Sequence, residues 1–195
     1  MLTAAGVASQ LSNGSLTVGL IGIAVDSAGN VYAADNSGNR IIEYPNGGAA
    51  EVVAISGVTL SGPAGVVVDG SGNLYVADSG NNRIVKITNG VGSVVSLGSL
   101  TVSNPRALSI DSPGNLYICD SGNNRMIEVP ASGNPAIVLS TGSAITLNAP
   151  VGAAISGSGD LYIMDAGNNR IVVSSQGHRA DPDLCEHCAG IDQPR

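Results

Sequence analysis

Tryptophan and phenylalanine are absent from this chain of 195 residues, and five tyrosines are its only aromatic residues. Large aromatic side chains therefore cannot anchor a core. Hydrophobic residues nevertheless make up 43% of the sequence, which excludes disorder caused by low hydrophobicity. The 27 glycines show no three-residue period, so a collagen-like chain is excluded as well. A core has to be built from many small contacts among valine, isoleucine, leucine and alanine.

Positive charge is also scarce. Eight lysines and arginines stand against 15 aspartates and glutamates, the formal net charge is −7, and Lys86 is the only lysine. Nucleic-acid binding usually requires a basic patch, so we expect no nucleic-acid partner. No apolar run reaches the roughly 18 residues of a membrane-spanning helix, and we expect no membrane span. The first residues lack the features of a signal peptide, which leaves the compartment open.

The three cysteines are odd in number and badly placed for a disulfide framework. Cys119 lies in an apolar stretch and is expected to be a buried, inert thiol. Residues 176–195 carry no repeat and are expected to form a disordered tail. A zinc site there is a weak candidate, because one CxxC spacing without a second pair is common by chance. Its ligands would be Cys185, Cys188, His187 and His178. We therefore expect no metal and no cofactor.

An internal repeat organises most of the chain. Four segments align without gaps, at residues 22–44, 65–87, 107–129 and 152–174. Their tyrosines recur at spacings of 43, 42 and 45, and an aspartate and an arginine keep the same spacings. Three residue types in one register predict a repeat architecture. The repeated tyrosines are Tyr32, Tyr75, Tyr117 and Tyr162.

Each repeat has the pattern of β-strands. In the second repeat, the apolar run at 66–68 is followed by an Asp-x-x-Gly-Asn turn at 69–73. Such a turn suits a hairpin, because aspartate bonds the backbone two residues on and glycine supplies a positive φ. Two further strands and a weaker fourth follow. Four antiparallel strands in about 43 residues are typical of a propeller blade. We expect the innermost strand to be the most apolar and to be buried on both faces.

The predicted fold is all-β, a propeller of about four antiparallel, four-stranded blades in residues 1–175. Its last unit has only three recognisable strands, and the segment 2–11 has the pattern of one strand that would complete it. The last unit is also degenerate, with Ser156 and Asp160 where the others have Asp and Asn, as is common in capping repeats. The predicted blades are about 22–56, 64–97, 106–140 and 151–174.

The phrase Gly-Asn-Leu-Tyr-Val-Ala-Asp-Ser-Gly-Asn-Asn-Arg-Ile-Val at 72–85 resembles the NHL repeat. The phrase recurs at 29–42, 114–127 and 159–172, so the resemblance covers roughly residues 11–174. It implies a β-propeller, usually of six blades, that most often serves as an interaction platform. The Gly- and Asn-rich units look like those of bacterial extracellular or surface NHL proteins, which implies such a location.

Four motif copies instead of six leave three arrangements open. These are a closed four-bladed ring, an open arc that pairs with another chain, and a fragment of a longer array. We favour the fragment or the open arc, since the family prefers six blades. Self-association through open blade edges would follow from an arc.

The repeated Asp-x-Gly-Asn-Asn-Arg phrase gives the main candidate site residues. We interpret its aspartates and arginines as structural pairs that hold the turn, because they occur in every unit. The pairs are Asp35 with Arg40, Asp78 with Arg83, Asp120 with Arg125, and Asp165 with Arg170. Amide side chains in the same loops are expected to form a ligand face. These are Asn36, Asn39, Asn81, Asn82, Asn123, Asn124, Asn168 and Asn169.

These observations favour a non-catalytic scaffold that binds a protein, peptide or carbohydrate. A general base near neutral pH is most often histidine, and both histidines lie outside the repeats. We therefore expect no catalytic residues and no enzyme. The alternative is a propeller lyase or lactone hydrolase with a metal site in its central channel, as found among NHL-like propellers.

Overall fold

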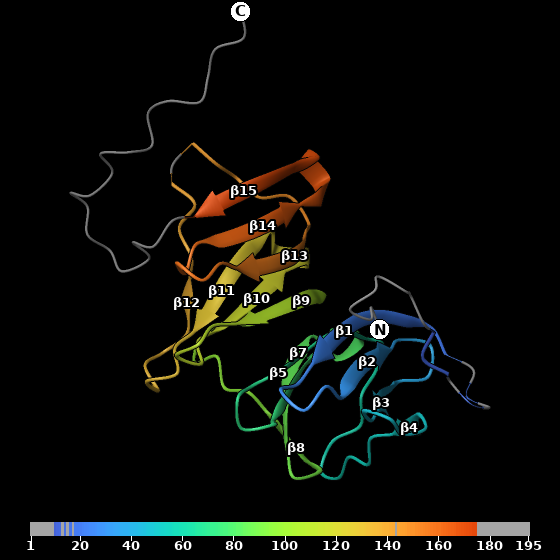
Figure 1. Ribbon diagram of the computed structural model, residues 1–195. Coiled ribbons are helices and arrows are strands. Elements are labelled where there is room, and N and C mark those ends of the chain that lie inside the picture. The colour runs from blue at the N-terminus through green and yellow to red at the C-terminus, as the bar shows by residue number, and fades with distance from the viewer. Residues whose placement is uncertain (1–9, 13, 15, 17, 143, 175–195) are drawn as a thin grey trace, which may run out of the picture.

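The computed structural model describes residues 10–12, 14, 16, 18–142 and 144–174. These residues form four antiparallel sheets and contain no α-helix, and therefore no helix that could cross a membrane. The fold is the predicted all-β arrangement of propeller blades, seen in Figure 1. The N-terminal strand predicted at 2–11 falls almost wholly outside the described residues, and the tail at 176–195 falls entirely outside them.

Each blade follows the chain from its innermost to its outermost strand. The first blade consists of β1 (Leu20–Val25), β2 (Val31–Asp35), β3 (Arg40–Tyr44) and β4 (Glu51–Val52). The second consists of β5 (Pro63–Val68), β6 (Leu74–Asp78), β7 (Arg83–Thr88) and β8 (Val91–Val94). The third consists of β9 (Pro105–Ile110), β10 (Leu116–Asp120), β11 (Arg125–Val129) and β12 (Ile137–Val138). The fourth has three strands in the described residues, β13 (Pro150–Ile155), β14 (Leu161–Asp165) and β15 (Arg170–Ser174).

The hairpin between the first two strands of a blade forms for the chemical reason that the sequence suggests. In the second blade, Asp69 Oδ1 accepts the backbone N–H groups of Ser71 and Asn73, both at 2.9 Å. The Asn73 amide donates to Asp69 Oδ2 at 2.8 Å, and Gly72 takes a φ of 80°. The side chains thus replace backbone partners that a tight turn leaves without bonds.

The second hairpin uses a different device. In three blades, one 3-10 turn links the second and third strands, at Ser79–Asn81, Ser121–Asn123 and Ala166–Asn168. An asparagine closes each turn in the left-handed conformation, as Asn82 does with φ 51°. Asparagine tolerates this conformation better than other side chains do, which explains its recurrence here.

Neighbouring blades pack face to face. Each sheet has two faces. The trailing face is the one that packs against the next blade along the chain, and the leading face is the one on the side of the preceding blade. Between the first two blades, Ala34 and Ile41 of the trailing face meet Val66, Val76 and Val85 of the leading face. Similar clusters join the second blade to the third and the third to the fourth. Small apolar side chains fill these junctions, which accounts for a core without tryptophan or phenylalanine.

The innermost strand, which we expected to be buried on both faces, is less buried than the second strand in the third blade. β10 is buried at every residue, whereas β9 has three buried residues, two half-buried residues and one exposed residue. The second strand has a strand on each side and, in an inner blade, another blade on each face. The innermost strand instead pairs with a strand on one side only.

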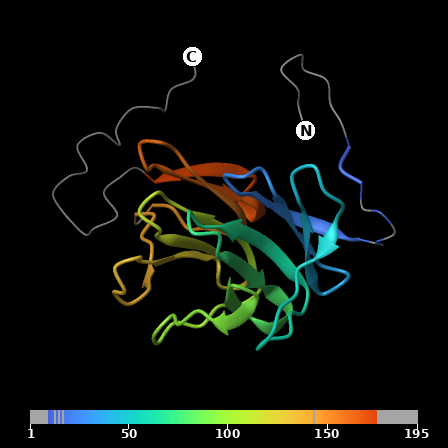
Figure 2. The same cartoon turned by 60° about the horizontal axis from the view of Figure 1, so that its bottom comes forward.

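The four blades form a series in the order of the chain. β1 packs on β5, β5 on β9 and β9 on β13, while no comparable packing joins β13 back to β1 in the described part of the chain. Figure 2 shows this succession from a second side. The leading face of β1 and the trailing face of the fourth blade carry exposed isoleucine, valine and methionine side chains. Among the described residues, these two faces at the ends of the series have no neighbouring blade.

Candidate functional site

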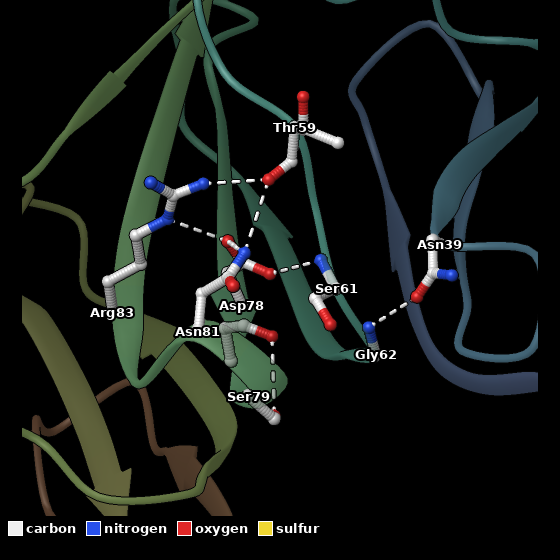
Figure 3. A network of polar contacts seen from close by, with 9 residues as sticks. Asn39, Thr59, Ser61, Gly62, Asp78, Ser79, Asn81 and Arg83 are labelled. Carbon is white, nitrogen blue, oxygen red and sulfur yellow. Dashed lines mark hydrogen bonds and ion pairs between the residues drawn. The ribbon is translucent and has the colours of Figure 1, made fainter.

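The repeated Asp and Arg side chains form an ion pair in every blade. The Arg Nε to Asp Oδ2 distances are 2.8, 2.7, 2.7 and 2.8 Å along the chain, and all four aspartates are fully buried. The pairs lie on one face of the molecule, where the second hairpins meet the segments that enter each innermost strand. We call this the connector face. Figure 3 shows it at the second blade, where Arg83 also donates to the Thr59 carbonyl at 2.7 Å.

Each buried carboxylate also accepts a backbone hydrogen bond from the segment that enters its own blade. The N–H of Ser61 donates to Asp78 Oδ1 at 2.7 Å, and Gly19 donates to Asp35 Oδ1 at 2.8 Å. Burial opposes ionisation of Asp35, but the Gly19, Gly38 and Arg40 donors outweigh it and lower the pKa of this carboxyl. The same balance lowers the pKa of Asp165, through Asn148, Asn168 and Arg170. Both carboxylates are ionised at neutral pH and tied into the fold.

The asparagines predicted as a ligand face are mostly engaged within the protein. Asn39 Oδ1 accepts the N–H of Gly62 at 2.7 Å, across the first junction (Figure 3). Asn82 accepts from Asn104 at 2.7 Å, and Asn124 accepts from Ala149 at 2.8 Å. These three asparagines therefore fasten one blade to the next.

The remaining amides of that set differ in their hydrogen-bond partners. Asn81 and Asn168 donate to the aspartate of their own loop and to a connector carbonyl. Asn123 donates to Asp120, and Asn36 reaches the Pro63 carbonyl at 3.4 Å. Asn169 alone makes no side-chain hydrogen bond to the described residues. A ligand on this face would therefore meet amides that already take part in internal hydrogen bonds, with Asn169 as the exception among these eight.

Two serines that the sequence places in the loops of the expected ligand face also link the blades. Ser79 donates to the Pro105 carbonyl and Ser121 to the Pro150 carbonyl, each across a junction. Both follow the repeated aspartate directly, and Asn36 stands at this position in the first blade. The fourth blade has Ala166 there, without a donor. The sequence signal for these bonds between blades was the polar residue that follows the repeated aspartate in three of the four repeats.

The opposite end of the innermost strands breaks the repeat symmetry. A cavity of about 290 Å³ lies between the hairpins of the third and fourth blades and is lined by Asp111 and Ser156, among others. The Ser156 hydroxyl lies 2.7 Å from the Ser158 hydroxyl. The Ser158 hydroxyl in turn donates to Asp160 Oδ2 at 2.7 Å. The other hairpins have Asp and Asn in place of Ser156 and Asp160. The sequence revealed this substitution, but we attributed it to capping because neither the cavity nor its Asp111 wall follows from one repeat.

The described residues offer neither a metal-binding group nor a reactive thiol. No three of their His, Cys, Asp and Glu side chains come together as a metal-binding group. Cys119 is buried, and burial raises the pKa of its thiol to about 12, so it stays protonated and unreactive. The weak zinc candidate of Cys185, Cys188, His187 and His178 lies outside the described residues.

Comparisons with known proteins identify the repeat. The family model described as NHL repeat matches residues 60–87, which cover the end of the first connector and the first three strands of the second blade. The chain is a β-propeller that contains an NHL repeat. The described residues form four blades, whereas the resemblance to the family implies six. A search of curated proteins finds no significant match.

Solved structures share this fold at low sequence identity. A streptogramin B lyase matches with TM-score 0.68 and 20% identity, over 89% of this chain and 60% of its own. A catalytically inactive virginiamycin B lyase variant from Staphylococcus aureus, with quinupristin, matches with TM-score 0.67 and 20% identity, over 80% and 52%. A gluconolactonase from Xanthomonas campestris matches with TM-score 0.68 and 17% identity, over 81% and 58%. The chain thus spans 52–60% of the length of these proteins, and the likeness establishes the fold.

These neighbours correct the expected function. We expected a non-catalytic binding scaffold, because the repeats hold no histidine and no asymmetric reactive cluster. The three structures are instead two lyases and a lactonase. They favour the alternative of a propeller lyase or lactone hydrolase, and the scaffold hypothesis is abandoned. Its error was to treat symmetry as evidence against catalysis, although a symmetric framework can carry a site at one asymmetric position.

Proposed function

We propose that this propeller belongs to an enzyme that cleaves cyclic esters, as a lactone hydrolase or as a lyase. The observation that carries the proposal is the superposition of its four blades on two lyases and a gluconolactonase with TM-scores of 0.67–0.68. At 17–20% identity the reaction does not transfer with the fold. The residues of this chain must therefore supply the further argument.

The asymmetric cavity is the place in the described residues that best suits such a substrate. It lies at the ends of β9 and β13, the innermost strands of the third and fourth blades. Its lining combines Ile110 and Ile155 with the carboxylate of Asp111 and the hydroxyl of Ser156. An apolar wall with a few polar groups is typical of small-molecule sites. Asp111 and Ser156 would hold hydroxyl or ester groups by hydrogen bonds.

The described residues do not fit a metal ion, because they bring no three suitable ligands together. We therefore assign no catalytic step to a metal. A base that works near neutral pH is most often histidine, and the histidines of this sequence are His178 and His187. The proposal places substrate binding at the cavity and leaves proton transfer to one of these groups.

The test is to incubate the full chain with glucono-lactone and with quinupristin and to follow the products by mass spectrometry. Hydrolysis adds one water to the mass of the ester, whereas elimination opens the ring without a change in mass. Either product, formed faster than without protein, supports the proposal and identifies the reaction. Unchanged substrates under all conditions, including added divalent metals, would refute it.

Matched variants locate the site. Asp111→Asn and Ser156→Ala should raise KM at least about tenfold, since each removes a hydrogen bond to the substrate. Asp69→Asn is the control, because Asp69 occupies the same turn position as Asp111 but lies outside this cavity. An equal effect of all three would mean that the turns act only through stability. Loss of turnover in His178→Ala or His187→Ala would identify the base.

A further inference from the structure

The three internal junctions follow one design, which defines what a complete junction requires. The trailing face supplies a buried aliphatic side chain on the third strand, at Ile41, Ile84 and Met126, each at most 1% exposed. The leading face supplies an apolar residue on the innermost strand, and Val66 there is only 3% exposed. The asparagine in the left-handed conformation then accepts a backbone N–H from the connector of the next blade.

The fourth blade carries the trailing half of such a junction without a partner. Ile171, at the position of Ile84 and Met126, is 59% exposed, and Met164 and Val173 on the same face are each 50% exposed. Asn169 has the left-handed φ of 52° seen at the other three asparagines, but its side chain has no hydrogen bond to the described residues. Val173 even replaces the charged residue that each of the other blades has at this position.

Gly152 adds an independent sign of a missing neighbour. At the matching positions of the first two blades, a Cβ on Gly22 would collide with the Ala64 carbonyl, and one on Gly65 would lie 2.9 Å from the Arg106 carbonyl. Those glycines allow the next blade to approach closely. Gly152 meets only Met164 of its own blade, so the space for an approaching backbone is open. The third blade has Ala107 at this position, which shows that the glycine is not needed by the sheet itself.

The first blade carries the complementary leading half. Ile23 occupies the register of Val66 and is 69% exposed, and Val25 on the same face is 59% exposed. Leu16 and Val18 cover the outer part of this face, over Ala33 and Ile42. Val58 and Leu60 have the same positions before β5 and do the same within the second blade.

The segment that enters the first blade therefore packs on its own blade as the corresponding segment of the second blade does. It leaves bare the part of the leading face that a preceding blade would contact.

We propose that the trailing face of the fourth blade binds the leading face of the first blade of a second copy of this chain, in the geometry of the internal junctions. The occupant is a second copy because one chain carries both halves, and each half matches residues that pair inside the molecule. In this contact Ile171 and Met164 lie against Ile23 and Val25, and Asn169 Oδ1 faces the N–H of Leu20. The contact is heterologous, so copies associate head to tail and close into a ring where the rotation allows. This inference stands independently of the proposed enzymatic activity.

The test measures the mass of the full chain by sedimentation velocity and light scattering. The wild-type chain should exceed its monomer mass of 19.3 kDa at micromolar concentration. Ile171→Arg and Ile23→Arg should each raise Kd more than about a hundredfold, because each places an unpaired charge in a closely packed apolar contact. Both side chains are exposed in the monomer, so circular dichroism should remain that of the wild type. If either variant loses its fold, Met164→Arg and Val25→Arg replace it.

Mixing the two variants gives the sharpest result. Each has one intact half, so an equimolar mixture should form a two-chain species that neither variant forms alone. Val138→Arg is the control, since Val138 is 44% exposed but lies on the outermost strand β12, away from both halves. A monomeric wild type, unaffected single variants or a mixture that stays monomeric would each overturn the proposal. Dissociation caused by Val138→Arg would point instead to pairing through the outer strand edges.

Discussion

Asp35, Asp78, Asp120 and Asp165 bury a charge completely, yet each is well compensated. The short side chain places one carboxylate oxygen against the Arg Nε of its own loop and the other against a backbone N–H of the entry segment. Glutamate would carry the charge further from its backbone donor, and asparagine would present an amide to the arginine. A buried ion pair of this kind fixes the loop geometry, while the loss of one member leaves an unpaired charge behind.

Replacing one of these aspartates should therefore destabilise the fold. Asp35→Asn is expected to lower the free energy of unfolding by about 3 kcal/mol at neutral pH, because Arg40 loses its charged partner. Since the folded-state pKa of Asp35 lies below 3.8, its contribution is complete above that value and disappears as the pH falls through the lower pKa. Urea unfolding from about pH 7 to about pH 2 should thus show the two proteins converging in acid.

Asp69→Asn is the matched control for this experiment. The Asp69 carboxylate lies in an exposed hairpin turn. Its replacement should lower the free energy of unfolding by only about 1 kcal/mol. A cost for Asp35→Asn no larger than that of the control, or one that does not shrink in acid, would argue against the ion pair as the source of stability.

At the scale of the elements, the hairpin turns were the part of the fold that the sequence predicted best. An Asp-x-x-Gly-Asn turn is a local object, since its hydrogen bonds run within five residues, as at Asp69 and Asn73. The hydrogen bonds that Asn39, Asn82 and Asn124 make between blades were not predicted, because their partners lie more than twenty residues ahead. The bond from Gly62 to Asn39 requires knowledge of where the next blade begins. Contacts that depend on the placement of two blades are invisible in one repeat.

Two asparagines allow the hydrogen bond between blades to be measured. Asn82 and Asn169 share the left-handed conformation, with φ of 51° and 52°, but only Asn82 has a described hydrogen-bond partner, the N–H of Asn104. Glycine accepts this conformation freely. Asn82→Gly should therefore lower the free energy of unfolding by about 1 kcal/mol more than Asn169→Gly, in dilute monomeric protein followed by urea unfolding. Equal effects would show that the bond to Asn104 adds no net stability.

For the whole molecule, the sequence predicted the number of repeats but not whether the blades close into a ring. Closure depends on the rotation from one blade to the next, which is set by side-chain volumes in every junction and leaves no periodic trace in the sequence. The exposed Ile23 and Ile171 could not be recognised either, because the repeat pattern gives each the same polarity as its buried counterparts. The cavity beside Asp111 and Ser156 likewise depends on how the third and fourth blades meet.

The net charge of the chain makes a last prediction at this scale. Each copy carries −7, so two copies repel each other, while the faces that we propose to meet are apolar. Added salt shortens the screening length from about 30 Å at 0.01 M to about 8 Å at 0.15 M and leaves the apolar contact intact. Head-to-tail association should therefore tighten as NaCl rises from about 20 mM to about 500 mM, with Kd falling about tenfold. Sedimentation velocity across this range measures the change. Dissociation by salt would mean that ion pairs hold the copies together, in contradiction to a junction built on Ile23, Met164 and Ile171.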